Sequence, residues 1–336
     1  KNKLVQISSI LDIVDGSLLN SPSISFIYSI KTNALKVKEG DLFIAKNINE
    51  IDLAIRNGAF AIIFDTNVPI IDNEIAWIKV KDIDISIIKL IRFKLAIKNI
   101  EAFYCNKIIY DLLKIYSTHF SKNVRLVPNK LENTFRFIDE IEDNDILISC
   151  NKNILDNIYP KNKDFDHINK LNEIDNLIEH SLFETSFSYE NVYFSRLKIS
   201  SLYITDFLKV FNFFKQNLDL TKLKSFYNFK PLFLDRNLNL VEFGKSDKFI
   251  ICQNNEDLYE NEISYMKKQY KYAKNIFITS SYVNYLSKDE QILMTDIEQL
   301  KPILRKLKFN GIYILGFNYN EVYEYLIKSE NIQTLF

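Results

Sequence analysis

Glycine is scarce in this chain, and its distribution excludes one common kind of nucleotide site. Six glycines occur in 336 residues, and none lies between Gly58 and Gly244. Glycine-rich phosphate loops need several glycines so that consecutive backbone amides can turn inward around a phosphate group. The middle of the chain therefore lacks the residues from which such a loop is built.

Cysteine and histidine are equally rare, and their spacing excludes two further classes of site. The three cysteines are Cys105, Cys150 and Cys252, and the three histidines are His119, His167 and His180. An odd number of distant cysteines without a CxxC pair argues against a disulfide framework and favours a reducing compartment, with each thiol buried at the end of an apolar run. No histidine has a second histidine or a cysteine at metal-ligand spacing, so no zinc site is predicted.

Excess charge and long apolar runs are also missing. Lys+Arg and Asp+Glu both number 43, so the net charge is zero and no basic field indicates a nucleic-acid partner. No stretch reaches the roughly 20 apolar residues that span a bilayer. The first twenty residues lack the apolar core and small-residue cleavage site of a secretory signal. We therefore expect a cytoplasmic protein with neither a nucleic-acid nor a membrane partner.

Short apolar runs alternate with amphipathic segments along the chain, which predicts layered α/β domains. Strands are expected at residues 41–45, 59–64, 75–80, 100–105, 124–127, 145–150, 248–252, 275–279 and 311–315, with helices at 49–57, 83–96, 107–117, 131–141, 203–216, 256–272, 297–307 and 320–328. Residues 151–180 are polar and aperiodic and are expected to form loop and short helix. Hairpins are expected at 187–199 and 230–243, and Phe207, Phe211 and Phe214 share a helix face typical of a core.

Residues 32–65 carry a motif that resembles a known family. The matching residues are Gly40, Asp41, Leu42, Phe43, Ala45, Gly58, Ala59 and Ala61. Their order and spacing resemble the N-terminal domain of the Mur ligases of peptidoglycan synthesis, particularly the tripeptide and D-Ala-D-Ala adding enzymes. The resemblance implies that Thr32, Asn33 and Asp41 are candidate substrate-binding residues. Where the family has Asp-Ser-Arg, this chain has Asn33, Ala34 and Leu35, which removes charge-assisted bonds to a UDP group.

A second, weaker match covers residues 100–117. Mur ligases have a strand, a glycine-rich phosphate loop ending in Lys-Thr/Ser, and a helix. Here Cys105 leads through Asn106 and Lys107 directly to Ile108 and Ile109. The resemblance implies Asn106 and Lys107 as the candidate ATP-binding residues, although the family's glycines and hydroxyl residues are absent. The residue type alone favours an exposed lysine at the start of a helix.

A third match, over residues 199–251, extends the resemblance to the last part of the chain. It implies a three-part Mur-ligase-like architecture with Rossmann-like central and C-terminal layers. The expected domains are residues 1–97, 98–228 and 229–336. The family's Asp-Tyr-Ala-His-Asn-Pro segment is replaced from Gln253 to Glu256, and Gly244-Lys245-Ser246 is interpreted as a turn rather than half a phosphate loop.

Three functions remain open from the sequence. The first is a non-catalytic Mur-ligase-like protein that needs no cofactor and binds a UDP-sugar peptide or a cell-wall enzyme. The second is an active ATP-dependent ligase, in which Lys107 or Lys245 contacts the phosphates together with Mg²⁺. The third is an interaction module that uses its C-terminal Gln333-Thr334-Leu335-Phe336 as a peptide ligand.

Overall fold

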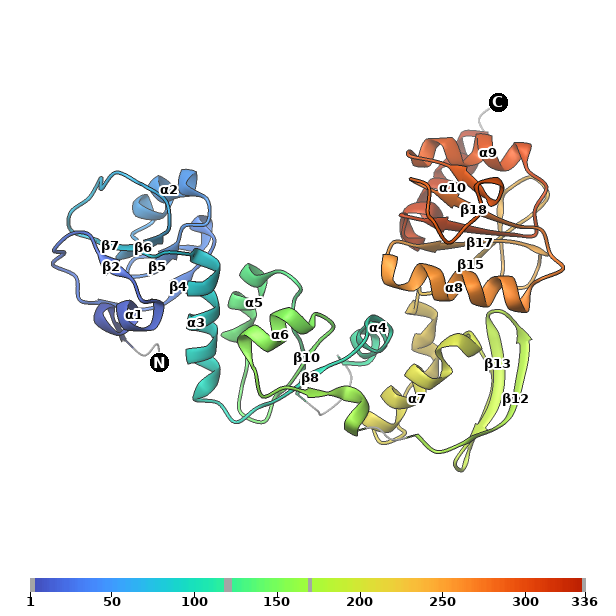
Figure 1. The fold of residues 1–336 in the computed structure, drawn as a ribbon, viewed down its shortest axis with the longest axis horizontal. Helices are drawn as coiled ribbons and strands as arrows, with labels where there is room; N and C mark the ends of the chain where they lie inside the picture. Colours follow the sequence, from blue (N-terminus) through green and yellow to red (C-terminus); the bar gives the residue numbers. More distant parts are fainter. Residues whose placement is uncertain (1–3, 118–122, 169–170, 334–336) are drawn as a thin grey trace. The chain divides into compact units, whose positions relative to one another are not determined.

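The computed structural model describes residues 4–117, 123–168 and 171–333, and the chain divides into two compact units (Figure 1). The first unit comprises residues 1–110 and 117–168, and the second comprises residues 111–116 and 169–336. The three-domain division at residues 97 and 228 stays a prediction. His119 and the tail residues 334–336 lie outside the described residues, as do the side chains of His167 and Gln333.

The first unit begins with a five-stranded sheet in the order β2-β7-β6-β5-β4. Its strands are β2 (Ser17–Leu18), β4 (Ile30–Lys31), β5 (Leu42–Ile44), β6 (Ala61–Phe64) and β7 (Ala76–Lys79), all parallel except β2. A small ladder pairs β1 (Val5–Gln6) with β3 (Phe26–Ile27). Helices α1 (Ile7–Val14), α2 (Ile51–Arg56) and α3 (Ile83–Ala96) accompany the sheet. Along β5, Leu42 and Ile44 belong to one buried cluster and Phe43 to another, so the sheet is covered on both faces.

A parallel sheet follows in the order β11-β8-β10-β9. The strands are β8 (Glu101–Tyr104), β9 (Val124–Leu126), β10 (Ile146–Ser149) and β11 (Lys163–Asp164). Between them lie α4 (Lys107–Tyr116), α5 (Leu131–Ile138) and α6 (Lys152–Ile158). The predicted alternation of strand and helix is therefore confirmed for residues 100–150.

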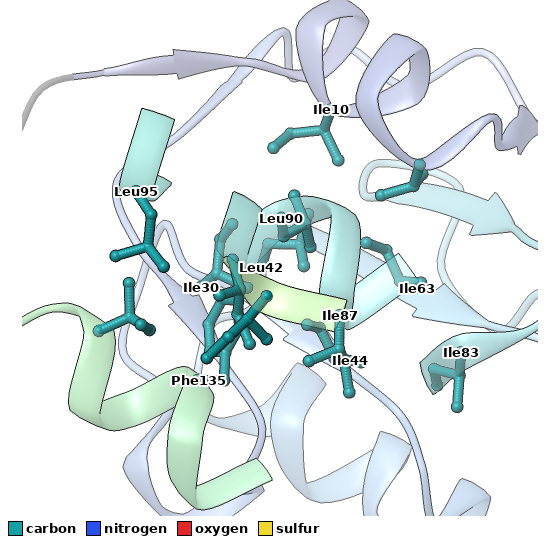
Figure 2. Close-up of a cluster of buried hydrophobic side chains, with 14 of the residues drawn as sticks. Ile10, Ile30, Leu42, Ile44, Ile63, Ile83, Ile87, Leu90, Leu95 and Phe135 are labelled. Atoms are coloured by element: carbon teal, nitrogen blue, oxygen red, sulfur yellow. The ribbon is translucent and has the colours of Figure 1, made fainter. Parts of the chain in front are cut away.

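Helix α3 joins these two layers through one apolar core. Figure 2 shows Ile87, Leu90 and Leu95 of α3 in the same cluster as Leu42 of the first sheet and Phe135 of α5. All five side chains are at most 2 % exposed. Because α3 is apolar toward both layers, the first 97 residues and the central sheet share a core within this unit.

The second unit begins with an antiparallel sheet of β12 (Ile174–Ser181), β13 (Glu184–Tyr189) and β14 (Val192–Leu197). The prediction of loop and short helix for 151–180 was wrong at its end, where β12 forms. Nearly every residue of β12 is exposed, so this edge strand carries no alternating apolar pattern. Helix α7 (Ile204–Phe213) packs on this region, and Phe207, Phe211 and Phe214 are buried as predicted.

A six-stranded sheet in the order β16-β15-β17-β20-β18-β19 completes the second unit. Its strands are β15 (Pro231–Leu234), β16 (Leu240–Val241), β17 (Lys248–Gln253), β18 (Asn275–Thr279), β19 (Gln291–Leu293) and β20 (Gly311–Leu315). Helices α8 (Glu256–Gln269), α9 (Leu300–Lys306) and α10 (Tyr319–Gln333) lie between and after the strands. The predicted hairpin and Rossmann-like layer are confirmed, whereas β19 was not predicted.

Candidate functional site

The turn between β8 and α4 holds the candidate ATP-binding residues Asn106 and Lys107. Two residues separate the last residue of β8, Tyr104, from the first residue of α4. The Cys105 backbone N–H donates to the Ser149 carbonyl at 3.0 Å, which continues the pairing with β10 past the end of the strand. The Cys105, Ile108 and Ile109 side chains are buried. The turn is therefore fixed by apolar burial on both sides of Asn106.

The Asn106 side chain caps the amino end of α4. Its Oδ1 accepts the backbone N–H of Ile109 at 2.8 Å, the arrangement of a helix N-cap. In a phosphate loop, amides at this position would instead face the ligand. The Lys107 Nζ lies 5.4 Å from the centre of the Tyr110 ring on its own helix. The Asn106 Oδ1 thus accepts the backbone N–H that a bound anion would accept in a phosphate loop.

Replacing Asn106 by alanine removes this cap, and we expect the first unit to lose about 1 kcal/mol of unfolding free energy. Urea unfolding followed by fluorescence of Trp77, the chain's one tryptophan, measures the change, because Trp77 is fully buried in the first unit. Asn153→Ala, at an exposed position inside α6, is the matched control and should change stability by less than about 0.5 kcal/mol. Equal effects of the two substitutions would contradict a capping role.

The structure brings two further Asn-Lys pairs to the same edge of the sheet. Strands β8, β10 and β9 are parallel neighbours, and each is followed by such a pair: Asn106-Lys107, Asn151-Lys152 and Asn129-Lys130. The Cys150 Sγ donates to the Asn129 Oδ1 at 3.7 Å, which joins two of the strand ends directly. The carboxyl edge of a parallel sheet is where α/β proteins bind ligands. The repeated pair is visible in the sequence, whereas the family resemblance indicates only the first pair as a candidate.

The candidate substrate-binding residues of the first sheet are not brought together. Asn33 follows the carboxyl end of β4, whereas Asp41 directly precedes the amino end of the parallel neighbour β5. The Asn33 Oδ1 accepts the Leu35 backbone N–H at 2.9 Å and caps the 3₁₀ helix η1 (Ala34–Lys36). Thr32 is half-buried between β4 and this cap. The three residues therefore lie at two opposite strand ends.

Asp41 and the two glycines of the motif have a structural role in the turn before β5. The Asp41 Oδ2 accepts the Lys38 backbone N–H at 3.0 Å, and Asp41 is 4 % exposed. The Gly40 backbone N–H donates to the Gly58 carbonyl at 2.9 Å. Gly40 and Gly58 have φ of 89° and 92°, a region that favours glycine. These contacts explain the surviving half of the motif as scaffold, without reference to a ligand.

The carboxyl end of β17, where the family resemblance places Asp-Tyr-Ala-His-Asn-Pro, forms a closed polar network instead. The Gln253 Oε1 accepts the backbone N–H groups of Asn254 and Asn255 at 3.1 and 3.0 Å. Its Nε2 donates to the Glu262 Oε1 at 3.1 Å and to the Asn228 Oδ1 at 3.3 Å. The amides that could hold a ligand at this strand end are therefore occupied by the protein itself.

Glu262 is the buried carboxyl at the centre of this network, and no sequence pattern indicates it. Tyr203 donates its hydroxyl to the Glu262 Oε1, and Tyr313 donates to the Oε2. Burial raises the pKa of Glu262 from 4.5 to about 7, against the three hydrogen bonds that favour the carboxylate. Glu262 is fully buried by α8, β17 and β20, so it is inaccessible to a substrate.

The remaining sequence candidates have local partners. The His180 Nε2 lies 2.7 Å from the Ser186 Oγ on the neighbouring strand. Gly244-Lys245-Ser246 forms the predicted turn, with the Ser246 Oγ donating to the Leu234 carbonyl at 2.5 Å. Among the described residues, no group of three or more His, Cys, Asp or Glu side chains is placed to hold a metal ion. No described helix has the length and apolar character required to cross a bilayer.

The layered arrangement of two parallel-sheet layers and a C-terminal Rossmann-like sheet is a mixed α/β fold, and it is the fold of the Mur ligases. MurF from Acinetobacter baumannii has a TM-score of 0.57 with 10 % identity, over 97 % of this chain and 99 % of that chain. The MurF ligase from Thermotoga maritima in complex with ADP has a TM-score of 0.54 with 14 % identity, over 89 % and 96 %. No protein-family model and no curated protein matches the chain.

Proposed function

We propose that this chain is a non-catalytic protein with the Mur ligase fold, which binds a peptidoglycan precursor or a ligase instead of forming an amide bond. The observation that carries the proposal is the Asn106 cap at the β8–α4 turn. The Asn106 Oδ1 accepts the Ile109 N–H at 2.8 Å, and Ile108 and Ile109 are buried. Ligation through an acyl phosphate requires a bound triphosphate, and this turn has no ring of inward-facing amides to hold one.

The two residues after Asn33, Ala34 and Leu35, help to distinguish a UDP-linked precursor from a protein partner. Ala34 is 1 % exposed, so its side chain is turned into the protein, and its backbone N–H donates to the Glu50 Oε2 at 3.4 Å. Leu35 is 78 % exposed at the position where the family has arginine. An exposed leucine offers no charge-assisted bond to a diphosphate, whereas it suits an apolar protein surface. These residues favour a ligase partner over a UDP-linked precursor.

Calorimetric titration of the purified protein with ATP and Mg²⁺ tests the proposal. We expect no heat and no shift of the unfolding temperature at 5 mM ATP, because a ligand that binds the native state stabilises it in proportion to its occupancy. No phosphate should be released when a UDP-muramoyl peptide and an amino-acid substrate are added. Heat from the UDP-muramoyl peptide alone identifies the precursor as the ligand, and heat from a MurF-type ligase identifies the partner.

The second candidate is an active ATP-dependent ligase with an atypical phosphate site. It is favoured by the three Asn-Lys pairs at the carboxyl edge of β8, β10 and β9, because lysine ammonium groups bind phosphate as point charges. In that case ATP binding should weaken in a Lys107→Gln, Lys152→Gln double variant and persist in the control Lys161→Gln, which lies beyond α6. Phosphate release that depends on Lys107 and Lys152 would replace the first proposal with this one.

A further inference from the structure

A cavity in the second unit is surrounded by lysines and contains no acidic residue. It has a volume of about 200 Å³ and lies between the link from β14 to α7 and the link from the 3₁₀ helix η6 (Leu220–Ser225) to β15. Its polar lining consists of Lys198, Ser200, Lys224, Asn228 and Lys230. Three cationic side chains thus meet one small cavity that provides no counter-charge.

The ammonium groups of Lys198 and Lys230 contact aromatic rings and a carbonyl rather than carboxylates. The Lys198 Nζ lies 4.0 Å from the centre of the Phe243 ring. The Lys230 Nζ lies 4.7 and 4.8 Å from the ring centres of Tyr227 and Tyr319, and it donates to the Lys224 carbonyl at 2.5 Å. Within the described part of the chain, none of the three lysines has a carboxylate within 4.0 Å.

Lys230 is the most enclosed of the three, because it lies between two tyrosine rings. Burial lowers the pKa of Lys230, which means that its charge lacks full compensation from solvent or protein. An anion that enters the cavity would supply this compensation, and it would gain charge-assisted hydrogen bonds of the stronger kind. The electrostatics of the cavity therefore favour an anionic ligand over a neutral or cationic one.

The other walls of the cavity are aromatic. Phe226 and Phe229 are 5 % and 2 % exposed, and Phe183 and Phe243 complete the lining. Phe183 and Phe243 also line an adjoining cavity of about 440 Å³, which extends along α8 to Tyr265 and Tyr270. A ligand with its anionic group among the lysines would therefore place any attached apolar part against these phenylalanine rings.

We propose that this cavity is a binding site for a small organic anion, a carboxylate or a phosphate ester, that carries an apolar or aromatic body. The site lies beside β15 and β17, since Pro231 of its lining is the first residue of β15 and pairs with Ile251 of β17. It adjoins the closed network at the carboxyl end of β17, because Asn228 lines the cavity and also accepts a hydrogen bond from the Gln253 Nε2 at 3.3 Å. An anion could bind here whether or not the chain is catalytic.

Ligand-observed NMR titration of the full chain with three matched probes tests this site. The probes are 3-phenylpropionate, phenyl phosphate and the neutral 3-phenylpropan-1-ol. We expect at least one of the two anions to bind saturably and the alcohol to bind at least 10-fold more weakly. A preference between the two anions distinguishes a carboxylate ligand from a phosphate ester, and inorganic phosphate alone should bind more weakly than phenyl phosphate.

Lysine variants locate the binding. Lys198→Gln and Lys224→Gln, both at exposed lysines that line the cavity, should each weaken the preferred anion by roughly 10-fold. Lys222→Gln lies in the same 3₁₀ helix as Lys224 but outside the lining, so it should leave the affinity unchanged. No saturable binding of either anion overturns the proposal, as does equal binding of the alcohol or equal weakening by Lys222→Gln. Circular dichroism of each variant confirms that the fold is retained.

Discussion

Replacing Glu262 by glutamine is expected to flatten the pH dependence of stability of the second unit between about pH 4.5 and pH 7. Burial raises the pKa of Glu262 from 4.5 in the unfolded chain to about 7 in the folded protein. A raised carboxyl pKa means that the folded state retains a proton that the unfolded state releases over this interval. The contribution of protonated Glu262 to the unfolding free energy is therefore fully present below pH 4.5. It falls by about 3 kcal/mol as the pH rises from there to the folded-state pKa of about 7.

Glutamine is the appropriate substitution because it resembles the protonated carboxyl in shape and charge. The Tyr203 and Tyr313 hydroxyls and the Gln253 amide all donate to Glu262, so an alanine would leave three buried donors without acceptors. Glu262→Ala should accordingly cost several kcal/mol at every pH. Glu262→Gln should instead cost least at pH 7.5, where the ionised carboxylate of the wild type is itself unfavourable.

Urea unfolding at pH 4.5, 6 and 7.5, followed by near-ultraviolet circular dichroism of the tyrosines, measures the difference between wild type and Glu262→Gln. Glu260→Gln, two residues away on the exposed face of α8, is the matched control and should preserve the wild-type pH dependence. Parallel curves for wild type and Glu262→Gln would show that the carboxyl does not titrate in this range. The tyrosines themselves do not contribute, since burial raises the pKa of Tyr203 and Tyr313 well above it.

Most elements of the fold could be predicted from the sequence because their signals are local. The helix at 83–96 coincides with α3, and its start is marked by Asp82, whose side chain accepts the Ile85 N–H at 2.9 Å. Strand β12 could not be predicted, because an exposed edge strand is defined by its partner β13 rather than by its own pattern. The same is true of the three-residue β19, which is ordered by pairing with β18.

The candidate site could be predicted in part. The family resemblance indicates Asn106 and Lys107 because it aligns the turn with a phosphate loop, and the structure places them at the carboxyl edge of a parallel sheet. Thr32, Asn33 and Asp41 stay predictions as substrate contacts. Glu262 and the three lysines around the small cavity had no sequence signal, because residues far apart in the chain meet there through tertiary packing. Charged residues in an amphipathic helix or a loop are by default assigned to the surface.

Replacing Gly58 by alanine is expected to destabilise the first unit by about 3 kcal/mol, the combined cost of a left-handed backbone and a steric clash. Gly58 has a φ of 92°, and a Cβ at this position would lie 2.8 Å from the Glu39 Cα and 3.1 Å from the Glu39 N. Backbone atoms cannot move aside as a flexible side chain does. The Gly58 carbonyl also accepts the Gly40 N–H, so any shift would open the turn that precedes β5.

Gly244→Ala separates the two costs, because Gly244 has a φ of 75° but a Cβ there would meet nothing within 4 Å. Its loss should be limited to the backbone conformation, about 1 kcal/mol. Urea unfolding followed by Trp77 fluorescence measures Gly58→Ala, and near-ultraviolet circular dichroism of the tyrosine-rich second unit measures Gly244→Ala. If both variants lose about 1 kcal/mol, the contact with Glu39 carries no weight, and the glycine of the motif is explained by its φ alone. A loss near 3 kcal/mol at Gly58 instead assigns the Gly-Ala half of the motif to the close packing of the turns at Gly40 and Gly58, which this sheet requires whatever the chain binds.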